Sequence, residues 1–256
     1  MTTTLHAEWT KVRTVGGLGW LLLAAAVLTA GVSAAVVVAT KYSPVSPQDT
    51  TKLALTGVDL GQAVIAILAV LIITGEYSTG MIRVTLAAMP RRPLVLAAKA
   101  AWVTALALAA GTVAVLACLL AARLVLPGNG FTPGHGYPLL SLAHGATLRA
   151  AVGSVLYLAL IALLSLGVAT AVRDSAVAIG VVLALLYLFP IVAQVAAPRW
   201  QHDLMQIGPM TAGLSIQATT HLRSLAIGPW AGLGVLAAWA AGALLAGGLV
   251  LRLRDA

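Results

Sequence analysis

The sequence predicts an all-α integral membrane protein with six transmembrane helices. Of its 256 residues 61% are hydrophobic and only 9% are charged, and the mean hydropathy is +1.01. Soluble domains are about 45–50% apolar and about 25% charged, and intrinsic disorder requires low hydrophobicity with high net charge. Both classes are therefore excluded. The net charge of +8 does not indicate nucleic-acid binding, because the basic residues are scattered between apolar blocks instead of clustering on one face.

Six segments are long enough to cross the membrane, since a helix needs about 20 apolar residues to span about 30 Å of hydrocarbon. They are residues 17–39, 57–75, 94–121, 148–172, 175–196 and 230–251. Their Ala-rich and aliphatic composition does not alternate as barrel strands do, which favours helices. The first apolar stretch exceeds the 7–15 residues of a signal-peptide core, so we expect a retained helix. Residues 1–256 are expected to form a single transmembrane domain.

The basic residues predict the orientation. An even number of spans places both termini on one side, which carries nine Lys and Arg residues against six on the other. The excess of basic residues marks the cytoplasmic side, and Arg83, Arg91 and Arg92 contribute most of it. Arg outnumbers Lys eleven to four and Ala and Gly abound, which indicates a GC-rich bacterial genome. We therefore expect a multi-pass protein of the bacterial plasma membrane with cytoplasmic termini.

The residues before the first span predict a short helix in the membrane interface. Leu5, Trp9 and Val12 recur at i, i+4 and i+7 and form an apolar face, with charged residues elsewhere around the helix. A frayed terminus is the alternative, because this apolar face is so small.

The second span is expected to begin with a capping box at Thr56–Asp59, after an irregular loop over residues 40–56. An acidic residue in a membrane helix also suggests a proton or cation site, but the position of Asp59 at the helix end favours capping. Gly57 and Gly61 form a small-xxx-small pair that would let another helix approach closely.

The second half of the chain contains three further signals. Only Arg173 and Asp174 separate the fourth and fifth spans, which predicts a tight helical hairpin. Pro190 should kink the fifth span, because proline removes a backbone donor. Residues 197–229 are too long for a simple connector and too apolar for a solvated loop. They predict a re-entrant or interfacial helical pair buried against protein, and an external cap is the alternative.

The sequence contains few groups able to perform chemistry. No span carries a charged residue near its middle, and Lys99 is placed to snorkel back to the cytoplasmic surface. Residues 75–80 imitate the glycine spacing of a P-loop, but Met81 and Ile82 stand where Lys and Ser or Thr are required. His135 and His144 lack metal-site spacing and carboxylate or Cys companions. We expect neither enzymatic activity nor a cofactor or metal in this chain.

Residues 75–93, between the second and third spans, contain the most specific pattern in the sequence. Ile82, Leu86 and Met89 share a helical face at i, i+4 and i+7, and Pro90 limits the helix. A short helix is therefore expected across the cytoplasmic ends of these two spans, which on structural grounds alone is an interfacial linker.

This pattern resembles the type-2 ABC exporter permeases, through Glu76-x-x-x-Gly80-x-x-Arg83-x-x-Leu86 followed by proline and basic residues before the third of six spans. The likeness extends to the interfacial N-terminal helix, the tight link before the fifth span and Gly208–Gly213 in the long apolar loop. It covers nearly the whole chain in layout.

The resemblance implies that the helix after span two is a coupling helix that docks into a separate ATP-binding subunit. The residues implied in this coupling are Glu76, Gly80, Ile82, Arg83, Leu86 and Met89. Two permease chains, identical or related, would work with two ATPase subunits, and ATP and Mg²⁺ would bind only to those partners. The cargo would be exported, with the loop before span six capping the outer end of its path.

The candidate substrate-path residues are Gln62, Tyr187, Phe189 and Gln194. For Gln194 the alternative is a hydrogen bond to another helix, and that alternative is the favoured one. Few aromatic residues and no central charges favour an apolar or amphipathic cargo. Two other functions remain open: a membrane sensor or immunity protein with the same fold but no net transport, and an autonomous carrier.

The predicted orientation is testable by cysteine labelling in a Cys118→Ala background. Arg92→Cys and Pro133→Cys are introduced singly, and intact cells are treated with an impermeant thiol reagent. We expect label only at position 133, because Arg92 follows the second span on the cytoplasmic side. Labelling of position 92 alone would invert the topology.

Overall fold

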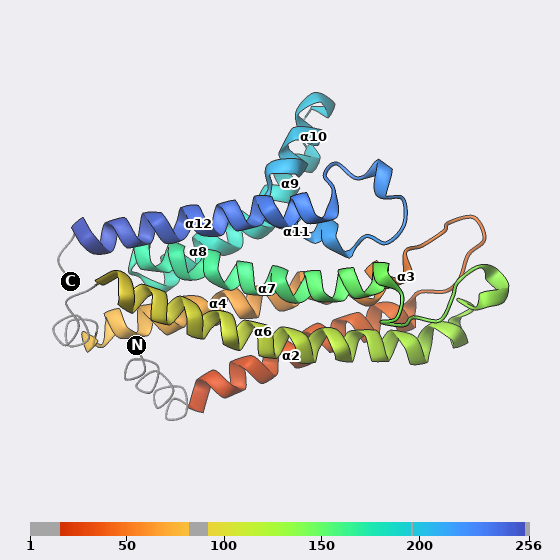
Figure 1. The fold of residues 1–256 in the computed structure, drawn as a ribbon, viewed down its shortest axis with the longest axis horizontal. Coiled ribbons are helices and arrows are strands. Elements are labelled where there is room, and N and C mark those ends of the chain that lie inside the picture. The colour runs from red at the N-terminus through yellow and green to blue at the C-terminus, as the bar shows by residue number, and fades with distance from the viewer. Residues whose placement is uncertain (1–15, 82–91, 196, 254–256) are drawn as a thin grey trace.

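The structure is a computed structural model that describes residues 16–81, 92–195 and 197–253 (Figure 1). Within these residues, six helices are long and apolar enough to cross a membrane, which confirms the predicted number of spans. They are α2 (Gly16–Ala39), α4 (Val58–Ser78), α6 (Arg92–Val125), α7 (Gly145–Val172), the helix α8–η3–α9 (Ser175–Leu183, Ala184–Leu188, Phe189–Val195) and α12 (Pro229–Leu253).

Shorter elements lie between the spans. They are α3 (Thr50–Ala54), η1 (Leu126–Asn129), η2 (Pro133–His135), α10 (Pro198–Ile207), α11 (Pro209–Gly213), η4 (Leu214–Gln217) and η5 (Leu222–Ser224). Leu5, Trp9 and Val12 of the expected N-terminal helix lie outside the described residues.

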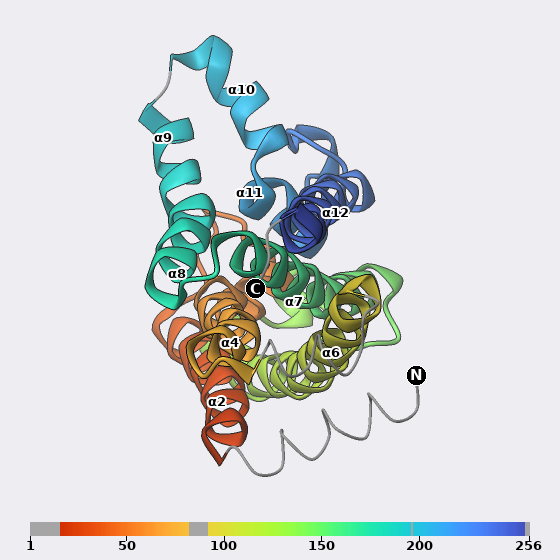
Figure 2. The same ribbon diagram turned by 90° about the vertical axis from the view of Figure 1, so that its left-hand side faces the viewer.

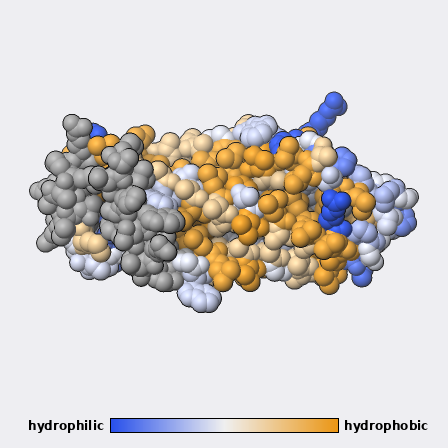
Figure 3. Space-filling model, turned by 60° about the horizontal axis from the view of Figure 1, so that its bottom comes forward, coloured by the Kyte–Doolittle hydropathy of each residue, from blue (hydrophilic) through white to orange (hydrophobic). Residues whose placement is uncertain are grey.

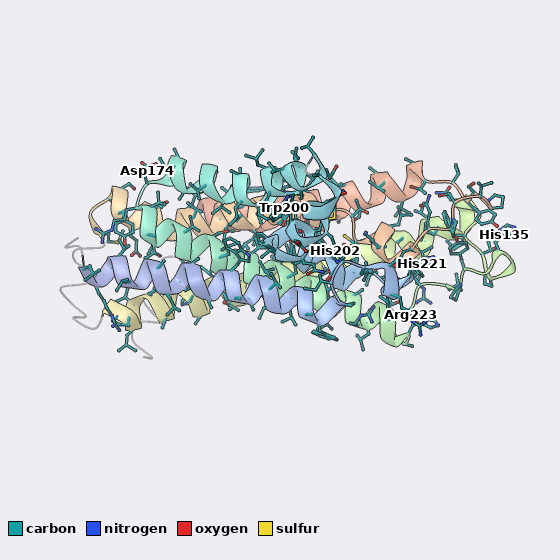
Figure 4. All side chains as sticks on the ribbon, turned by 90° about the horizontal axis from the view of Figure 1, so that it is seen from above. His135, Asp174, Trp200, His202, His221 and Arg223 are labelled. Atoms are coloured by element: carbon teal, nitrogen blue, oxygen red, sulfur yellow. The ribbon has the colours of Figure 1, made fainter. Side chains whose placement is uncertain are left out.

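The long helices run roughly parallel or antiparallel, and α7 lies at their centre (Figures 1 and 2). One face shows a broad hydrophobic band, with hydrophilic residues gathered beyond it (Figure 3). His135, His221 and Arg223 lie at one end and Asp174 at the other (Figure 4). We call the first the α3 end and the second the Arg173 end. An apolar band between two polar ends is the distribution expected of a multi-pass membrane protein.

Small residues set the closest helix contacts. The backbone N–H of Gly57 donates to Ser33 Oγ at 2.9 Å, and a Cβ on Gly57 or Gly61 would collide with Thr29 of α2. The predicted close approach at this glycine pair is therefore present. A Cβ on Gly167 of α7 would likewise collide with Ala243 of α12. Small residues permit such van der Waals packing, which holds helices together where lipid removes the hydrophobic drive.

The predicted capping box at Thr56–Asp59 is wrong. Gly57 is the N-cap of α4 and no side chain caps it. Thr56 Oγ1 instead donates back to the carbonyls of Leu53 and Lys52, at 3.0 and 3.2 Å. The reason is that residues 50–54, expected to be irregular, form α3, and Thr56 completes the end of that helix.

The link between α7 and α8 is as tight as predicted. Arg173 adopts a left-handed conformation with φ of 65° and ends α7. Asp174 then caps α8, because its Oδ1 accepts the backbone N–H of Val177 at 2.8 Å.

The fifth span runs without interruption from Ser175 to Val195 but contains a π-helical turn just before Pro190. The turn before the proline, η3, is π-helical, and Figure 2 shows α9 leading away from the rest of the bundle. Proline removes a backbone donor, and a widened turn relieves the mismatch between the proline ring and the preceding helix. A π-helical turn thus stands directly before the proline at which the sequence predicted a kink.

A bend at Gly208–Pro209 separates α10 from α11. Three carbonyls at the end of α10 find partners there: Leu204 O accepts from Gly208 N at 3.0 Å, Met205 O from Thr211 Oγ1 at 2.8 Å, and Ile207 O from Trp239 Nε1 at 2.8 Å. Beyond the bend, α11 and η4 are largely buried against α12 and α7, whereas α10 projects from the bundle (Figure 1).

The Asp49 carboxylate fastens the loops of the α3 end. As N-cap of α3 it accepts the backbone N–H groups of Thr51 and Lys52 at 3.1 and 3.0 Å. It also accepts the backbone N–H groups of Thr219 and Thr220, at 2.5 and 2.9 Å, and their hydroxyls. One carboxylate thus joins the segment after α2 to the segment before α12.

An aromatic cluster closes the same end. Tyr42 stacks on His135 with ring centroids 4.4 Å apart, and Phe131 and Tyr137 meet it edge-on. The ring of His135, a residue to which the sequence assigned no role, packs on Tyr42, and its Nδ1 lies 2.7 Å from Gly130 O.

Replacing Asp49 should weaken the α3 end. Burial alone would raise the pKa of the Asp49 carboxyl, but the hydrogen bonds from Thr219, Lys52 and Thr220 outweigh it and hold the pKa below its ordinary value of 3.8. An Asn at this position keeps its amide oxygen as an acceptor for the N-cap of α3. Its amide NH₂ group, however, would face the backbone N–H groups of Thr219 and Thr220, which need an acceptor. We expect Asp49→Asn to cost about 1.5–3 kcal/mol at pH 7.

The stabilisation that the Asp49 carboxylate provides should depend on pH. Because the folded pKa is depressed, the carboxylate's contribution is fully present above the unfolded value near 3.8 and is lost as pH falls through the folded value. Thermal unfolding in detergent should therefore separate wild type from Asp49→Asn at pH 7 and bring them together as the pH falls below the folded pKa of Asp49. Asp203→Asn, on the exposed side of α10, serves as the control. A constant difference at every pH would contradict the role of the charge.

Candidate functional site

A buried ion pair joins α4 and α6 at the Arg173 end. Lys99 Nζ lies 2.7 Å from Glu76 Oε1, and the exposed fractions of the two side chains are 0% and 7%. Glu76 belongs to the last turn of α4 and Lys99 to the second turn of α6. The prediction that Lys99 snorkels to the surface is wrong, because a carboxylate on the neighbouring helix holds its ammonium inside the protein.

This pair is costly to form and more costly to break. Removing two charges from water carries a penalty of several kcal/mol per ion, which close contact and hydrogen bonding roughly offset. Loss of one partner then leaves a buried charge without its counter-ion. The contact thus makes the separation of α4 from α6 at this level expensive.

Arg173 adds a second connection next to the pair. Its guanidinium lies over the ring of Tyr77, 5.5 Å from the centroid, and Nη2 donates to Val250 O at 3.3 Å. Tyr77 belongs to α4 and Val250 to α12, so the end of α7 is held against both. Together with Glu76 and Lys99, these contacts fasten the ends of four long helices at one level.

The segment that follows α4 leaves the helix at a defined point. Gly80 has a φ of 68°, in the left-handed region that favours glycine, and Thr79 is the C-cap residue before it. Met81 is the last residue described before α6, which begins at Arg92. Four residues of the predicted coupling set lie outside the described residues: Ile82, Arg83, Leu86 and Met89.

The candidate substrate-path residues do not all meet in one place. Gln62 is fully buried on α4, where its Nε2 donates to Asp59 O at 3.0 Å. Tyr187 reaches the same carbonyl from η3, with its hydroxyl 2.5 Å away. Phe189 contacts the backbone region of Gly208, so it supports the bend between α10 and α11. Gln194, near the end of α9, is exposed.

Tyr157 is the central residue that the sequence reasoning did not single out. It is fully buried on α7, its hydroxyl donates to Gln62 Oε1, and its ring lies against Gly213 of α11. A tyrosine in the middle of an apolar span is a signal that might have revealed it, since its hydroxyl requires an internal partner in a membrane. Tyr157 connects α4, α7 and the segment before α12.

The described part of the chain does not meet the requirements of a metal site. Among residues 16–81, 92–195 and 197–253 no three His, Cys, Asp or Glu side chains come together in a way that could hold a metal ion.

No protein-family model matches this sequence, and no curated protein matches it. The functional assignment thus depends on the residues and their geometry.

The ion pair is tested by removing one partner and then both. Lys99→Met should lower the free energy of unfolding by about 3–5 kcal/mol, because Glu76 keeps a buried charge. Glu76→Leu combined with Lys99→Met should recover most of the loss. Thermal unfolding in detergent measures both, with Lys52→Met on the exposed side of α3 as control. If the single variant were as stable as wild type, the pair would contribute nothing to the fold.

Proposed function

We propose that this chain is the transmembrane permease subunit of an ATP-driven exporter of the type-2 ABC class. The observation that carries the proposal is the Glu76–Lys99 ion pair. It fastens the two helices that flank residues 82–91, the segment whose sequence resembles a coupling helix. A segment that receives force from a partner must be attached to helices that move with it, and a buried ion pair provides such an attachment.

In this proposal residues 82–91 contact the ATP-binding subunit. Glu76 and Gly80 position the start of the segment, and Ile82, Leu86 and Met89 form the apolar ridge that enters the partner, with Arg83 beside it. ATP and Mg²⁺ bind to the partner alone. A second permease, identical or related, completes the path for the cargo, which leaves the cytoplasm of a bacterium.

The segment before α12 is the proposed re-entrant element. Three carbonyls at its bend have internal hydrogen bonds, and α11 and η4 are packed against α12 and α7. Non-helical backbone is tolerated at membrane depth only when protein satisfies its polar groups in this way. With the Arg173 end on the cytoplasmic side, this element caps the outer half of the path.

A proton- or ion-coupled carrier is the second candidate, and the same ion pair is the observation that favours it. Ionisable residues inside a membrane mark proton and ion pathways in many carriers. The pair lies near the helix ends, whereas carriers use groups near the midplane, which favours the exporter. Transport that continues without any ATPase would decide for the carrier. Absence of substrate-dependent flux, with an ATPase bound, would instead indicate a sensor or immunity protein.

Charge reversal at Arg83 tests the proposed coupling. If Arg83 flanks a groove of the ATPase, Arg83→Glu removes a contact worth about 1.5–3 kcal/mol. Binding of the ATPase should then weaken by roughly ten- to a hundred-fold. Co-purification of the ATPase and transport-coupled hydrolysis measure the effect, at membrane levels matched to wild type.

Arg252→Glu is the matched control, because Arg252 is exposed on α12 near the same end of the bundle. It should leave both measurements unchanged. Wild-type binding and hydrolysis in Arg83→Glu would remove the coupling assignment, since an arginine that only contacts lipid phosphate predicts that result.

A further inference from the structure

An apolar groove of about 900 Å³ opens on the side of the bundle between α8 and α12. Leu164 and Val168 of α7 form its floor, Leu185 belongs to the α8–η3 wall, and Trp239 and Gly242 belong to the α12 wall. Figure 2 shows the same arrangement, with α7 between and below α8 and α12. The volume falls within the range of about 300–1,000 Å³ typical of small-ligand sites.

The end of α10 borders the groove, and we call it the roof. Ile207, the last residue of α10, is part of the lining, and its carbonyl accepts the indole N–H of Trp239 from the opposite wall. The departure of α9 from the bundle, caused by η3 and Pro190, leaves room beneath this roof. The groove is thus bordered by the π-helical turn of the fifth span on one side and by the Trp239–Ile207 hydrogen bond on the other.

The lining selects an uncharged, apolar occupant. No lining residue carries a charge, and among the described residues around the groove the indole N–H of Trp239 is the one polar side-chain group, already used as a donor. Apolar cavities do not hold water stably, and an empty groove would lose the dispersion contacts of its walls. In a membrane the groove is therefore filled by hydrocarbon or by another helix.

Size and the roof favour a lipid tail over a helix. A helix with side chains is about 10 Å across, so about 900 Å³ accommodates only about two turns of one. A spanning helix would have to continue past Ile207 and α10, which project beside the groove. A single acyl chain ends within the groove and meets no such obstacle.

The side chains of α10 are of the kind that contact lipid head groups. Trp200 is 56% exposed on α10, and His202 and Gln206 follow on the same helix, with 2.8 Å between His202 Nε2 and Gln206 Nε2 (Figure 4). Tryptophan and polar side chains gather at the level of lipid head groups. A helix with polar side chains therefore borders the apolar groove.

We propose that this groove holds one acyl tail of a membrane phospholipid, with the head group at α10. The tail lies between α8 and α12 over Leu164 and Val168, and its terminal methyl points away from α10. The proposal requires no ATPase partner and stands if the coupling assignment fails.

Photolabelling of the full-length chain tests the proposal. The probe is a phosphatidylcholine with a diazirine near the end of one acyl chain, mixed with the purified protein in detergent micelles. Labelling should saturate at about one lipid per chain and be displaced by unlabelled phosphatidylcholine. It should map by mass spectrometry to peptides around Val168, Val181 and Ala246, the lining residues nearest the Arg173 end. Label spread evenly over exposed apolar residues, without saturation, would overturn the proposal.

Two glycines of α12 provide a matched pair of variants. A Cβ on either Gly242 or Gly234 meets nothing within 4 Å, so both accept a larger side chain, but only Gly242 lines the groove. Gly242→Leu should reduce saturable labelling at least fivefold, and Gly234→Leu should leave it unchanged. Equal labelling of both variants would contradict the site.

A second copy of the chain is the competing occupant. Gly242→Cys in a Cys118→Ala background should stay free of inter-chain disulfides when membranes are oxidised, because lipid separates the two copies at this position. A disulfide-linked pair would show that the groove is an interface between copies and would overturn the lipid assignment.

Discussion

Hydrocarbon offers no hydrogen-bond partner, so each backbone N–H and C=O group that lies in it must be satisfied by the protein. The bend at Gly208–Pro209 meets this requirement with the hydroxyl of Thr211, the indole of Trp239 and one backbone N–H. Because the bend is satisfied, α11 and η4 can pack against α7 without orphaned carbonyls. The contact between Gly213 and Tyr157 depends on that packing, and through Tyr157 so does the connection to α4.

The two ends of the bundle are held by different chemistry. At the α3 end, one half-exposed carboxylate gathers N–H and O–H donors from two loops. At the Arg173 end, the Glu76–Lys99 pair is excluded from water. Exposed hydrogen bonds exchange easily with solvent, whereas a buried ion pair separates only at high cost. The α3 end is therefore the easier of the two to open, which suits an alternating-access mechanism with a rigid attachment at the proposed coupling side.

The spans could be predicted because the thickness of the hydrocarbon requires about 20 apolar residues, which composition alone reveals. The close helix approach at Gly57 and Gly61 could be predicted because two small residues four apart let another helix come near. The partners of polar groups could not be read in this way. Lys99 was expected at the surface because snorkelling needs only its own helix, whereas its true partner, Glu76, comes from another. The predicted capping box at Thr56 failed for a local reason, because the Thr56 hydroxyl donates to carbonyls of the short helix α3 that precedes it. The hydrogen bond between Tyr157 and Gln62 could not be predicted, because nothing near either residue in the sequence indicates that the two meet.

The π-helical turn η3 has a consequence for how this span tolerates insertions and deletions. A π turn accommodates one more residue than the α-helical turn it replaces, and each residue of an α-helix turns the chain by about 100°. Removing one residue from Ala184–Leu188 would convert this stretch into an ordinary α-helical turn and leave the orientation of α9 nearly unchanged, because the wider turn already absorbs the surplus residue. Removing one residue from α8 would instead rotate α9 by about 100° relative to the start of the span, and Phe189 would then face away from Gly208. The π turn is therefore the stretch of this span that tolerates the loss of a residue best.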